Sequence, residues 1–278
     1  MPSLKSDLEW LCVPRSPELE PEALARVRDR LRDELRSMGY AVEEQRLDGD
    51  AAPYPNLLAR LEGSEDGPLH VVGAHYDSVP ASPGADDNAS AVAALLHVMR
   101  AFAGTRPRTP IVFAAYSLEE YGFLGSREHA RSLKAAGASV GGMVSLEMLG
   151  YTSAAQDYPP GLGWFYPKEG RFIAAVADWA SRPFLARWAE GMRLVEGLDV
   201  QTLSAPGAGL ILPELRLSDH SPFWDEGYPA LMLTDTSFFR NPHYHLPSDT
   251  LDTLDLGFLA KVADGVVRAL GRVTGLAT

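Results

Sequence analysis

Two adjacent carboxylates, Glu119 and Glu120, follow the apolar run 111–116 and precede the turn-like pair Tyr121-Gly122. Acids side by side at the end of a strand can divide the work of a hydrolytic metal site, because one can hold the ion while its neighbour moves a proton. The alternative interpretation is that both are first-turn acids that interact favourably with a helix dipole. The pair therefore raises the hypothesis of a metal-dependent hydrolase.

Three further groups have the residue types that metal sites use. His75 and Asp77 are one residue apart on an extended segment, so the carboxylate can orient the imidazole, although a structural histidine is the alternative. Asp87 lies in an Asp-Asp-Asn run that can equally cap a helix. Glu147 stands inside the apolar segment 143–149, where burying an acid is costly unless it is paired or bound to a metal.

The apolar pattern predicts the elements that must position these residues. Apolar positions at spacings of three and four indicate helices, and short apolar runs bounded by turn residues indicate strands. Alternation of the two favours an α/β fold with a largely parallel sheet covered on both faces. We expect helices over residues 20–38, 123–136, 171–188 and 256–274, a helix from about 87 through 99, and strands over 56–62, 69–75, 111–117, 142–149 and 229–235.

The predicted strands also indicate where the residues of a binding or catalytic site should lie. In open α/β sheets, ligands bind beyond the carboxyl ends of the strands. His75, the acid pair and Glu147 fall at or near such ends, and His245 follows the loop that leaves the strand at 229–235. Five residues of metal-binding type at successive strand ends of one sheet predict a metal centre.

Composition restricts the remaining possibilities. The 278 residues are 46% hydrophobic and carry a formal net charge of -12, which argues against nucleic acid or an anionic membrane surface as the main partner. Cys12 is the only cysteine, so histidines and carboxylates must hold any metal. The first residues lack the apolar core of a signal peptide and no apolar run approaches ~20 residues, so we expect a cytoplasmic protein. No linker divides the chain, which predicts a single domain over 1–278 without a separate lid or dimerisation domain.

Five motifs, in this order, closely resemble those of the M28 zinc peptidases, the family of the secreted bacterial leucine-type aminopeptidases. The resemblance runs from about residue 20 to 270. It implies a three-layer αβα sandwich with a mixed, largely parallel central sheet, the fold shared with zinc carboxypeptidases and aminoacylases. The motifs are Gly73-Ala-His-Tyr-Asp-Ser-Val79, Pro83-Gly-Ala-Asp-Asp-Asn-Ala-Ser90, Leu118-Glu-Glu-Tyr-Gly-Phe-Leu-Gly-Ser126, Ser218-Asp-His220 and Tyr244-His-Leu-Pro-Ser-Asp-Thr250.

The resemblance implies a ligand set. Asp87 would bridge two zinc ions and would be followed by a cis peptide bond. His75 and Glu147 would complete one site, and Glu120 and His245 would complete the other. Co²⁺ or Mn²⁺ can replace zinc at ligands of this type.

The resemblance also implies roles around the metals. Glu119 would be the general base, and Tyr244 would help to bind the tetrahedral oxyanion. Asp77 would orient the histidine that precedes it. Asp219 and His220 would buttress the site.

The loops should set specificity. Tyr151 and Trp164 belong to an aromatic-rich stretch, 151–166, that could wall an apolar side-chain pocket or simply pack locally. Arg240 could bind a substrate carboxylate, as a carboxypeptidase needs, or could be an exposed surface residue. Aminopeptidases of the family carry Asp where this chain has Glu147, whereas Glu is common there in carboxypeptidases and aminoacylases.

These observations lead to three hypotheses about function. The leading one is a two-zinc aminopeptidase that removes N-terminal, apolar residues from a peptide or amino-acid amide substrate. The second is a related zinc carboxypeptidase, an aminoacylase-type amidohydrolase, or a glutaminyl cyclase, which uses nearly the same ligands with one zinc. The third is a binding module on an inactive peptidase fold, against which the presence of Glu119 counts.

Overall fold

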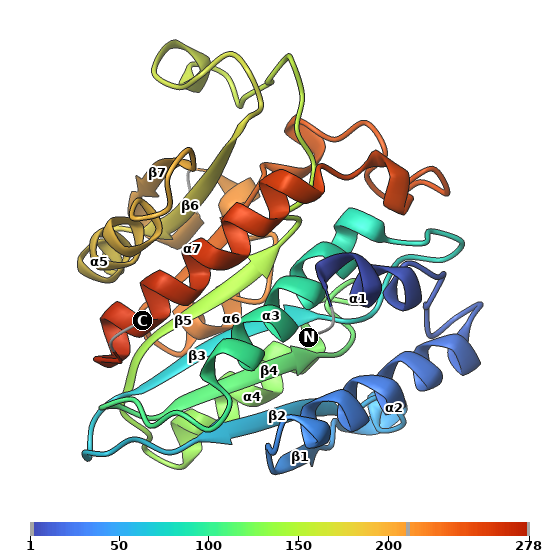
Figure 1. The fold of residues 1–278 in the computed structure, drawn as a ribbon, viewed down its shortest axis with the longest axis vertical. Helices are drawn as coiled ribbons and strands as arrows, with labels where there is room; N and C mark the ends of the chain where they lie inside the picture. The colour runs from blue at the N-terminus through green and yellow to red at the C-terminus, as the bar shows by residue number, and fades with distance from the viewer. Residues whose placement is uncertain (1–2, 210–211, 277–278) are drawn as a thin grey trace.

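An eight-stranded mixed sheet runs through the molecule (Figure 1). The structure is a computed structural model that describes residues 3–209 and 212–276. Its strands have the spatial order β1-β2-β4-β3-β5-β8-β6-β7. Their bounds are β1 Val42–Gln45, β2 Asn56–Leu61, β3 Leu69–His75, β4 Ile111–Tyr116, β5 Val140–Glu147, β6 Phe172–Asp178, β7 Asp199–Ala205 and β8 Ala230–Thr234.

Parallel pairing dominates the centre of this sheet. β3 lies parallel to both β4 and β5, β5 lies parallel to β8, and β6 lies parallel to β7. β2 is antiparallel to β1 and β4, and β6 is antiparallel to β8. The predicted mixed, largely parallel sheet is therefore confirmed, and the carboxyl ends of β3, β4, β5 and β8 meet at one edge.

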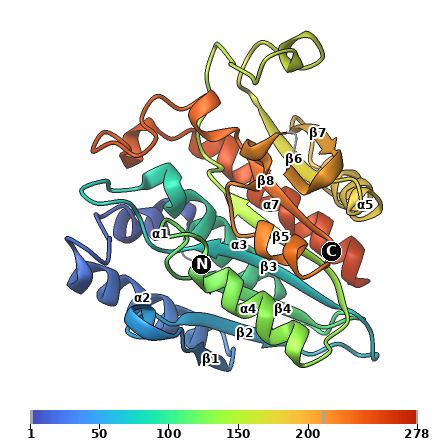
Figure 2. The same ribbon diagram turned by 180° about the vertical axis from the view of Figure 1, so that it is seen from behind.

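Helices cover both faces of the sheet and complete the predicted αβα sandwich (Figures 1 and 2). One face packs against α1, α2, α3, α5 and α7, whose buried side chains form the larger core. The opposite face packs against α4 and α6. The helix bounds are α1 Leu4–Leu11, α2 Pro21–Ser37, α3 Ala91–Phe102, α4 Leu124–Ala135, α5 Arg182–Met192, α6 Ser221–Asp225 and α7 Leu256–Thr274.

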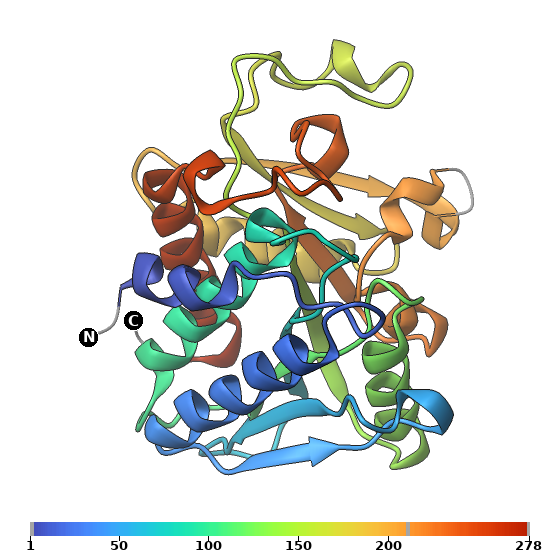
Figure 3. The same ribbon diagram turned by 90° about the vertical axis from the view of Figure 1, so that its right-hand side faces the viewer.

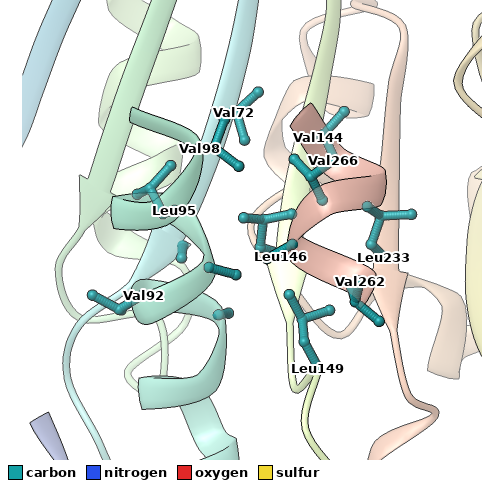
Figure 4. Packing of buried hydrophobic residues seen from close by; sticks show 14 of the residues in the cluster. Val72, Val92, Leu95, Val98, Val144, Leu146, Leu149, Leu233, Val262 and Val266 are labelled. Carbon is teal, nitrogen blue, oxygen red and sulfur yellow. The ribbon is translucent and has the colours of Figure 1, made fainter. Parts of the chain in front are cut away.

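The longest helix, α7, contributes one apolar face to the larger core (Figure 4). It begins after Asp255, whose carboxylate accepts a 2.9 Å hydrogen bond from the Phe258 amide, and it ends at Gly275 in the left-handed conformation. Beside it, α3 packs on the same strands. Among the described helices, α7 included, none has the length and apolar content to cross a membrane. The buried side chains of this face include Leu259, Val262, Val266 and Leu270.

The predicted helix over residues 171–188 is wrong. Residues 172–178 form β6, and the helix α5 begins only at Arg182. The alanine-rich run in β6 has good helix propensity, but its side chains from 172 to 177 are buried and its backbone pairs with β7 and β8. Pairing with strands far along the chain therefore overrides the local preference. Sequence analysis also did not predict α1, β1 or β7.

Truncation of the α7 face tests this packing. Leu259→Ala should reduce the free energy of unfolding by about 2–5 kcal/mol, because Leu259 is fully buried and its loss leaves a cavity. Leu19→Ala, at a side chain that is 66% exposed, should change it by less than about 0.5 kcal/mol. Urea unfolding of both variants measures the difference, and equal effects would contradict the assigned core.

Candidate metal centre

The carboxyl edge of the sheet collects the five predicted ligands. His75 is the last residue of β3, and Glu147 is the last residue of β5. Glu120 follows β4, Asp87 lies in the turn Ala85–Ser90 that precedes α3, and His245 lies in the segment after β8. Parallel strands bring these separate positions to one place. The structure thus unites all five side chains.

Asp87 stands between the two histidines and presents a different oxygen to each. Its Oδ1 lies 3.4 Å from His75 Nε2, and its Oδ2 lies 3.1 Å from His245 Nε2. On the first side, His75 Nε2 is also 3.5 Å from Glu147 Oε2. On the second side, His245 Nε2 is 3.2 Å from Glu120 Oε2. Both histidines therefore contact the same aspartate. Possible ligand atoms that all lie within 4.8 Å of one another form two groups, His75-Glu119-Glu147 and His75-Asp87-Glu120.

These separations fit metal ligands. Ligand atoms that each lie about 2.1 Å from a tetrahedral zinc are separated from one another by about 3.4 Å. His75 Nε2, His245 Nε2 and Glu120 Oε1 are also buried without a hydrogen-bond partner. Buried polar atoms without partners are costly, so a cation would satisfy them. The residues present therefore fit zinc.

Glu119 lies beside the same cluster. Its Oε2 is 3.9 Å from His75 Nε2, and its ligand atom falls within 4.8 Å of those of His75 and Glu147. The predicted partner Asp77 lies 3.5 Å from His75 Nδ1 through its Oδ1. It also accepts hydrogen bonds from the backbone amides of Glu119 and Glu120, at 3.2 and 3.3 Å. One carboxylate therefore contacts both the imidazole and the acid pair.

Burial and mutual repulsion disturb the ionisation of the acid pair. Burial is the main cause that raises the pKa of Glu119 well above its usual range, and Glu147 adds to the rise while His75 opposes it. Burial, with repulsion from Asp87, raises the pKa of Glu120 to about 7. Both acids therefore tend to hold protons when no metal is bound.

The histidines and the shared aspartate shift in the direction that favours their charged forms. Burial opposes charge on His245, but contacts with Asp87 and Glu120 raise its pKa to about 10. Burial likewise opposes charge on His75, yet Glu119 and Glu147 raise its pKa well above the usual value. Burial would raise the pKa of Asp87, but both histidines hold it below its usual range. A metal must therefore displace protons on binding.

The loop that carries Asp87 is fixed by its neighbours. Asp249 accepts hydrogen bonds from the amides of Asp86 and Asp87, at distances from 3.0 to 3.2 Å. The Asn88 side chain spans the carbonyl of Leu146 and the amide of Met148, both at 2.9 Å. The peptide bond between Asp87 and Asn88 is cis, as predicted. Asp87 is thus tied to the end of β5.

Arg15 is a supporting residue that sequence analysis missed. Its guanidinium is fully buried and donates to the backbone oxygen of Tyr76 at 2.8 Å and to that of Gly84 at 3.0 Å. Among the described residues, no carboxylate forms an ion pair with it. It therefore joins the residue after His75 to the loop before Asp87. Nothing in the local sequence distinguishes this arginine, because its partners are backbone carbonyls.

The remaining predicted residues surround the cluster in different ways. Tyr244 stacks on His245 with ring centroids 3.7 Å apart. Asp219 is fully buried, and burial is the main cause that raises its pKa to about 7. His220 is bound through Nε2 to the Leu215 carbonyl at 2.7 Å, so it supports a cavity wall and does not reach the ligand atoms directly.

Ser218 is a second residue whose contact was not foreseen. Its hydroxyl donates a 2.8 Å hydrogen bond to Glu147 Oε2 and lies 2.7 Å from the Ser145 hydroxyl. It thereby fixes the carboxylate of Glu147. The Ser218-Asp-His220 motif was visible in the sequence, but only the structure connects its first residue to Glu147.

A solvent-open cavity begins at the acidic cluster and extends between β6, β7, β8 and the connection from β5 to β6. Two aromatic residues of that connection, Tyr158 and Tyr166, contribute to its lining. The connection projects beyond the rest of the molecule (Figures 1 and 3). Most of the wall is apolar, with Phe172, Ala174, Val176, Leu203, Leu212, Leu215, Leu217, Met232, Phe238 and Phe239.

The three side chains predicted to bind substrate do not line this cavity. Trp164 is 89% exposed on the projecting connection. Tyr151 makes an edge contact with His243, with ring centroids 5.9 Å apart. Arg240 is only 6% exposed, and its guanidinium donates to Gln156 Oε1 at 2.8 Å and to the Phe172 carbonyl at 2.9 Å. Arg240 is therefore not an exposed surface residue, which was one of the two alternatives, but a buried one that ties the wall together.

A cluster of histidines and carboxylates at the carboxyl edge of an αβα sheet, beside an apolar cavity, defines a metal-dependent hydrolase. Comparison with known proteins specifies the family. The model of peptidase family M28 matches residues 56–270, so the chain belongs to this family of zinc peptidases, as its motifs predicted.

Similar sequences and structures agree with this assignment. The uncharacterized protein YfbL of Escherichia coli is 39% identical over 251 residues, which cover 84% of this chain and 76% of that protein. A probable leucine aminopeptidase of Trichophyton verrucosum is 27% identical over 238 residues, and the match spans 80% of this chain but only 58% of that relative.

Solved structures with the same fold include an aminopeptidase and a glutaminyl cyclase. The LapA aminopeptidase of Legionella pneumophila superposes with a TM-score of 0.79 at 21% identity, covering 99% of this chain and 72% of that one. The glutaminyl cyclase of Porphyromonas gingivalis superposes with a TM-score of 0.70 at 22% identity, covering 96% and 97%. At these identities, the likeness concerns the fold.

The stability of the metal-free protein should fall as pH rises from about 5 to 9. Glu120 and His245 have pKa values near 7 and 10 in the fold, above their unfolded values of about 4.3 and 6.5. Groups with raised pKa values stabilise the fold below the unfolded pKa and lose that effect as pH rises through the folded one. Melting temperatures with chelator measure this slope. Zinc-loaded protein should show a shallower slope, and a metal-free protein that gains stability over this range would contradict the assignment.

Removal of the Arg15 side chain tests its connecting role. Arg15→Met should weaken zinc binding by about 10-fold, because residues that orient ligands typically contribute that much to metal affinity. Arg60→Met, at an exposed arginine paired with Glu62, is the matched control and should bind zinc like the wild type. Competition with a chromophoric chelator measures both affinities, and equal values would contradict the role.

Proposed function

We propose that the protein is a two-zinc aminopeptidase that removes apolar N-terminal residues. His75, Asp87 and Glu147 would hold one ion, and Asp87, Glu120 and His245 would hold the other. The shared aspartate supports this division, because each of its oxygens lies 3.1–3.4 Å from a different histidine nitrogen. Bound zinc lowers the pKa of water to about 7 and polarises a carbonyl oxygen.

The negative charges along the cavity favour an aminopeptidase over a carboxypeptidase. Six carboxylates line it, and no lysine or arginine is among the described residues that do so. A free N-terminal ammonium group suits such surroundings, whereas the C-terminal carboxylate that a carboxypeptidase must bind would lack a cation. Arg240, the one residue considered for that task, does not line the cavity; its Nε and Nη1 donate to Gln156 and to backbone carbonyls, and only its buried Nη2 is without a partner. The carboxylates are Asp87, Glu119, Glu120, Glu147, Asp157 and Glu214.

Glu119 is the proposed proton carrier. It is 8% exposed and lines the cavity. Its Oε2 lies 3.9 Å from His75 Nε2, but it is not one of the five proposed metal ligands. Burial raises its pKa, which suits a carboxylate that accepts a proton from attacking water and then delivers it to the leaving amine. Asp77 would hold its backbone in place through the amide hydrogen bond.

Tyr244 is the proposed donor to the oxyanion. Its side chain lines the cavity and stacks on His245, so its hydroxyl would be available to a carbonyl bound beside that histidine. Burial is the main cause that raises its pKa above the usual range, and the nearby acids add to this. The hydroxyl therefore keeps its proton at neutral pH and can donate a hydrogen bond.

The apolar walls suit an apolar side chain of the N-terminal residue. Phe172 and Val176 of β6 and Met232 of β8 line the space that adjoins the acidic cluster. Burying a Leu or Met side chain there would contribute about 1.5–3 kcal/mol. The enzyme should therefore prefer leucine or methionine over alanine at the N-terminus of its substrate.

Two substitutions separate the roles of the acid pair. Glu119→Gln should retain both zinc ions and lower kcat on leucine p-nitroanilide by about 10²–10⁴-fold, because it removes the proton carrier. Glu120→Gln should lose zinc from one site after dialysis, because it removes a ligand. Zinc content and kcat are measured on each variant. The assignment is wrong if the two variants behave alike in both measurements.

A substrate panel on the zinc-loaded wild type distinguishes the related activities. Hydrolysis of leucine p-nitroanilide is expected, without hydrolysis of an N-acyl amino acid. Release of an N-acyl group would indicate an aminoacylase, and cyclisation of an N-terminal glutamine peptide would indicate a glutaminyl cyclase. Glu119→Gln serves as the inactive control for every substrate.

A further inference from the structure

Glu214 is an acid in the cavity that the proposed chemistry does not use. It lies in the short helix Pro213–Arg216, between Leu212 and Leu215, which also line the cavity. This segment contributes none of the proposed metal ligands. Glu214 is therefore a separate negative charge in the apolar wall.

The Glu214 carboxylate has no partner within the described part of the chain. The residue is partly exposed, but its Oε2 is buried, and no hydrogen bond or ion pair reaches the side chain from the described residues. The nearby cation Arg216 is already engaged, because it donates to Asp225 at 2.6 Å and to the Ala208 carbonyl at 2.8 Å. A buried carboxylate oxygen without a donor is costly to the fold, so a group that enters the cavity is the available partner.

The rest of the wall suits a long side chain with a charged end. Tyr158 and Tyr166 stack with ring centroids 5.9 Å apart. Their hydroxyls donate hydrogen bonds to the backbone carbonyls of Pro167 and Thr202. The two rings therefore contribute aromatic surface, to which a cation is attracted. Apolar neighbours such as Met232 can pack against a methylene stem, as lysine and arginine stems do elsewhere.

We propose that Glu214 binds the cationic end of an N-terminal lysine or arginine side chain, so that the cavity accepts basic residues as well as apolar ones. The proposal rests on the aminopeptidase function proposed above. The methylene stem would occupy the apolar wall next to the acidic cluster. The ammonium or guanidinium group would then reach Glu214, while the α-amine stays with the acids at the metal end.

Norleucine makes the test specific, because its side chain has the lysine stem without the ammonium group. The kcat/KM of lysine, arginine, norleucine and leucine p-nitroanilides is measured for the zinc-loaded wild type and for Glu214→Gln, which keeps the shape and removes the charge. The variant should lose about 10-fold or more on lysine and arginine, as expected for a lost charge-assisted hydrogen bond. Its norleucine and leucine values should change by less than about 2-fold.

Glu43→Gln is the matched control, because it makes the same substitution at an exposed glutamate of β1 that does not line the cavity. It should leave the ratio of lysine to norleucine turnover unchanged. Glu214→Gln that affects lysine and norleucine equally would overturn the proposal. So would an unchanged lysine value. Melting temperatures of both variants verify the fold.

The failure of the proposed function is distinguishable from failure of this inference. A wild type that cleaves none of the four anilides refutes the aminopeptidase function alone. Calorimetric binding of free lysine and norleucine to the zinc-loaded protein then decides about Glu214. Tighter binding of lysine that disappears in Glu214→Gln supports the cation site, and equal binding of the two amino acids overturns it.

Discussion

Negative charge crowded around one buried imidazole is the constraint on which the rest of the site depends. His75 is fully buried, and Asp77, Asp87, Glu119 and Glu147 all place an oxygen within 3.9 Å of its nitrogens. So many carboxylates in a dry place repel one another, and each also loses hydration. The cluster is tolerable only when protons or cations balance it, which is the condition that a metal site creates.

Several parts of the fold offset this negative charge and hold the ligands in place. Parallel strands deliver the side chains to one edge, and backbone amides donate to Asp77 and Asp249. Arg15 adds a buried positive charge behind the loop that carries Asp87. Ser218 donates to Glu147 and fixes its carboxylate. These contacts hold the ligands in place before any ion arrives, which reduces the ordering that binding requires.

Negative charge is also the main polar feature of the cavity. Acids line it from the cluster to Glu214, while the nearby arginines are engaged elsewhere, Arg240 with carbonyls and Arg216 with Asp225. The same fold occurs in one protein that is named an aminopeptidase and in another that is named a glutaminyl cyclase. These two names denote different reactions. The fold therefore leaves the reaction open, and the side chains along the cavity must select it.

The sequence by itself determined the ligand candidates and most of the elements. Ligands at strand ends can be predicted because periodicity and motifs are local, and a histidine that closes an apolar strand needs no distant information. Only the tertiary structure decided that residues 172–178 pair as a strand, because that outcome depends on β7 and β8. It also decided that Arg240 is buried while Glu214 is without a partner, since a side chain's exposure and charge balance depend on residues far away in the chain.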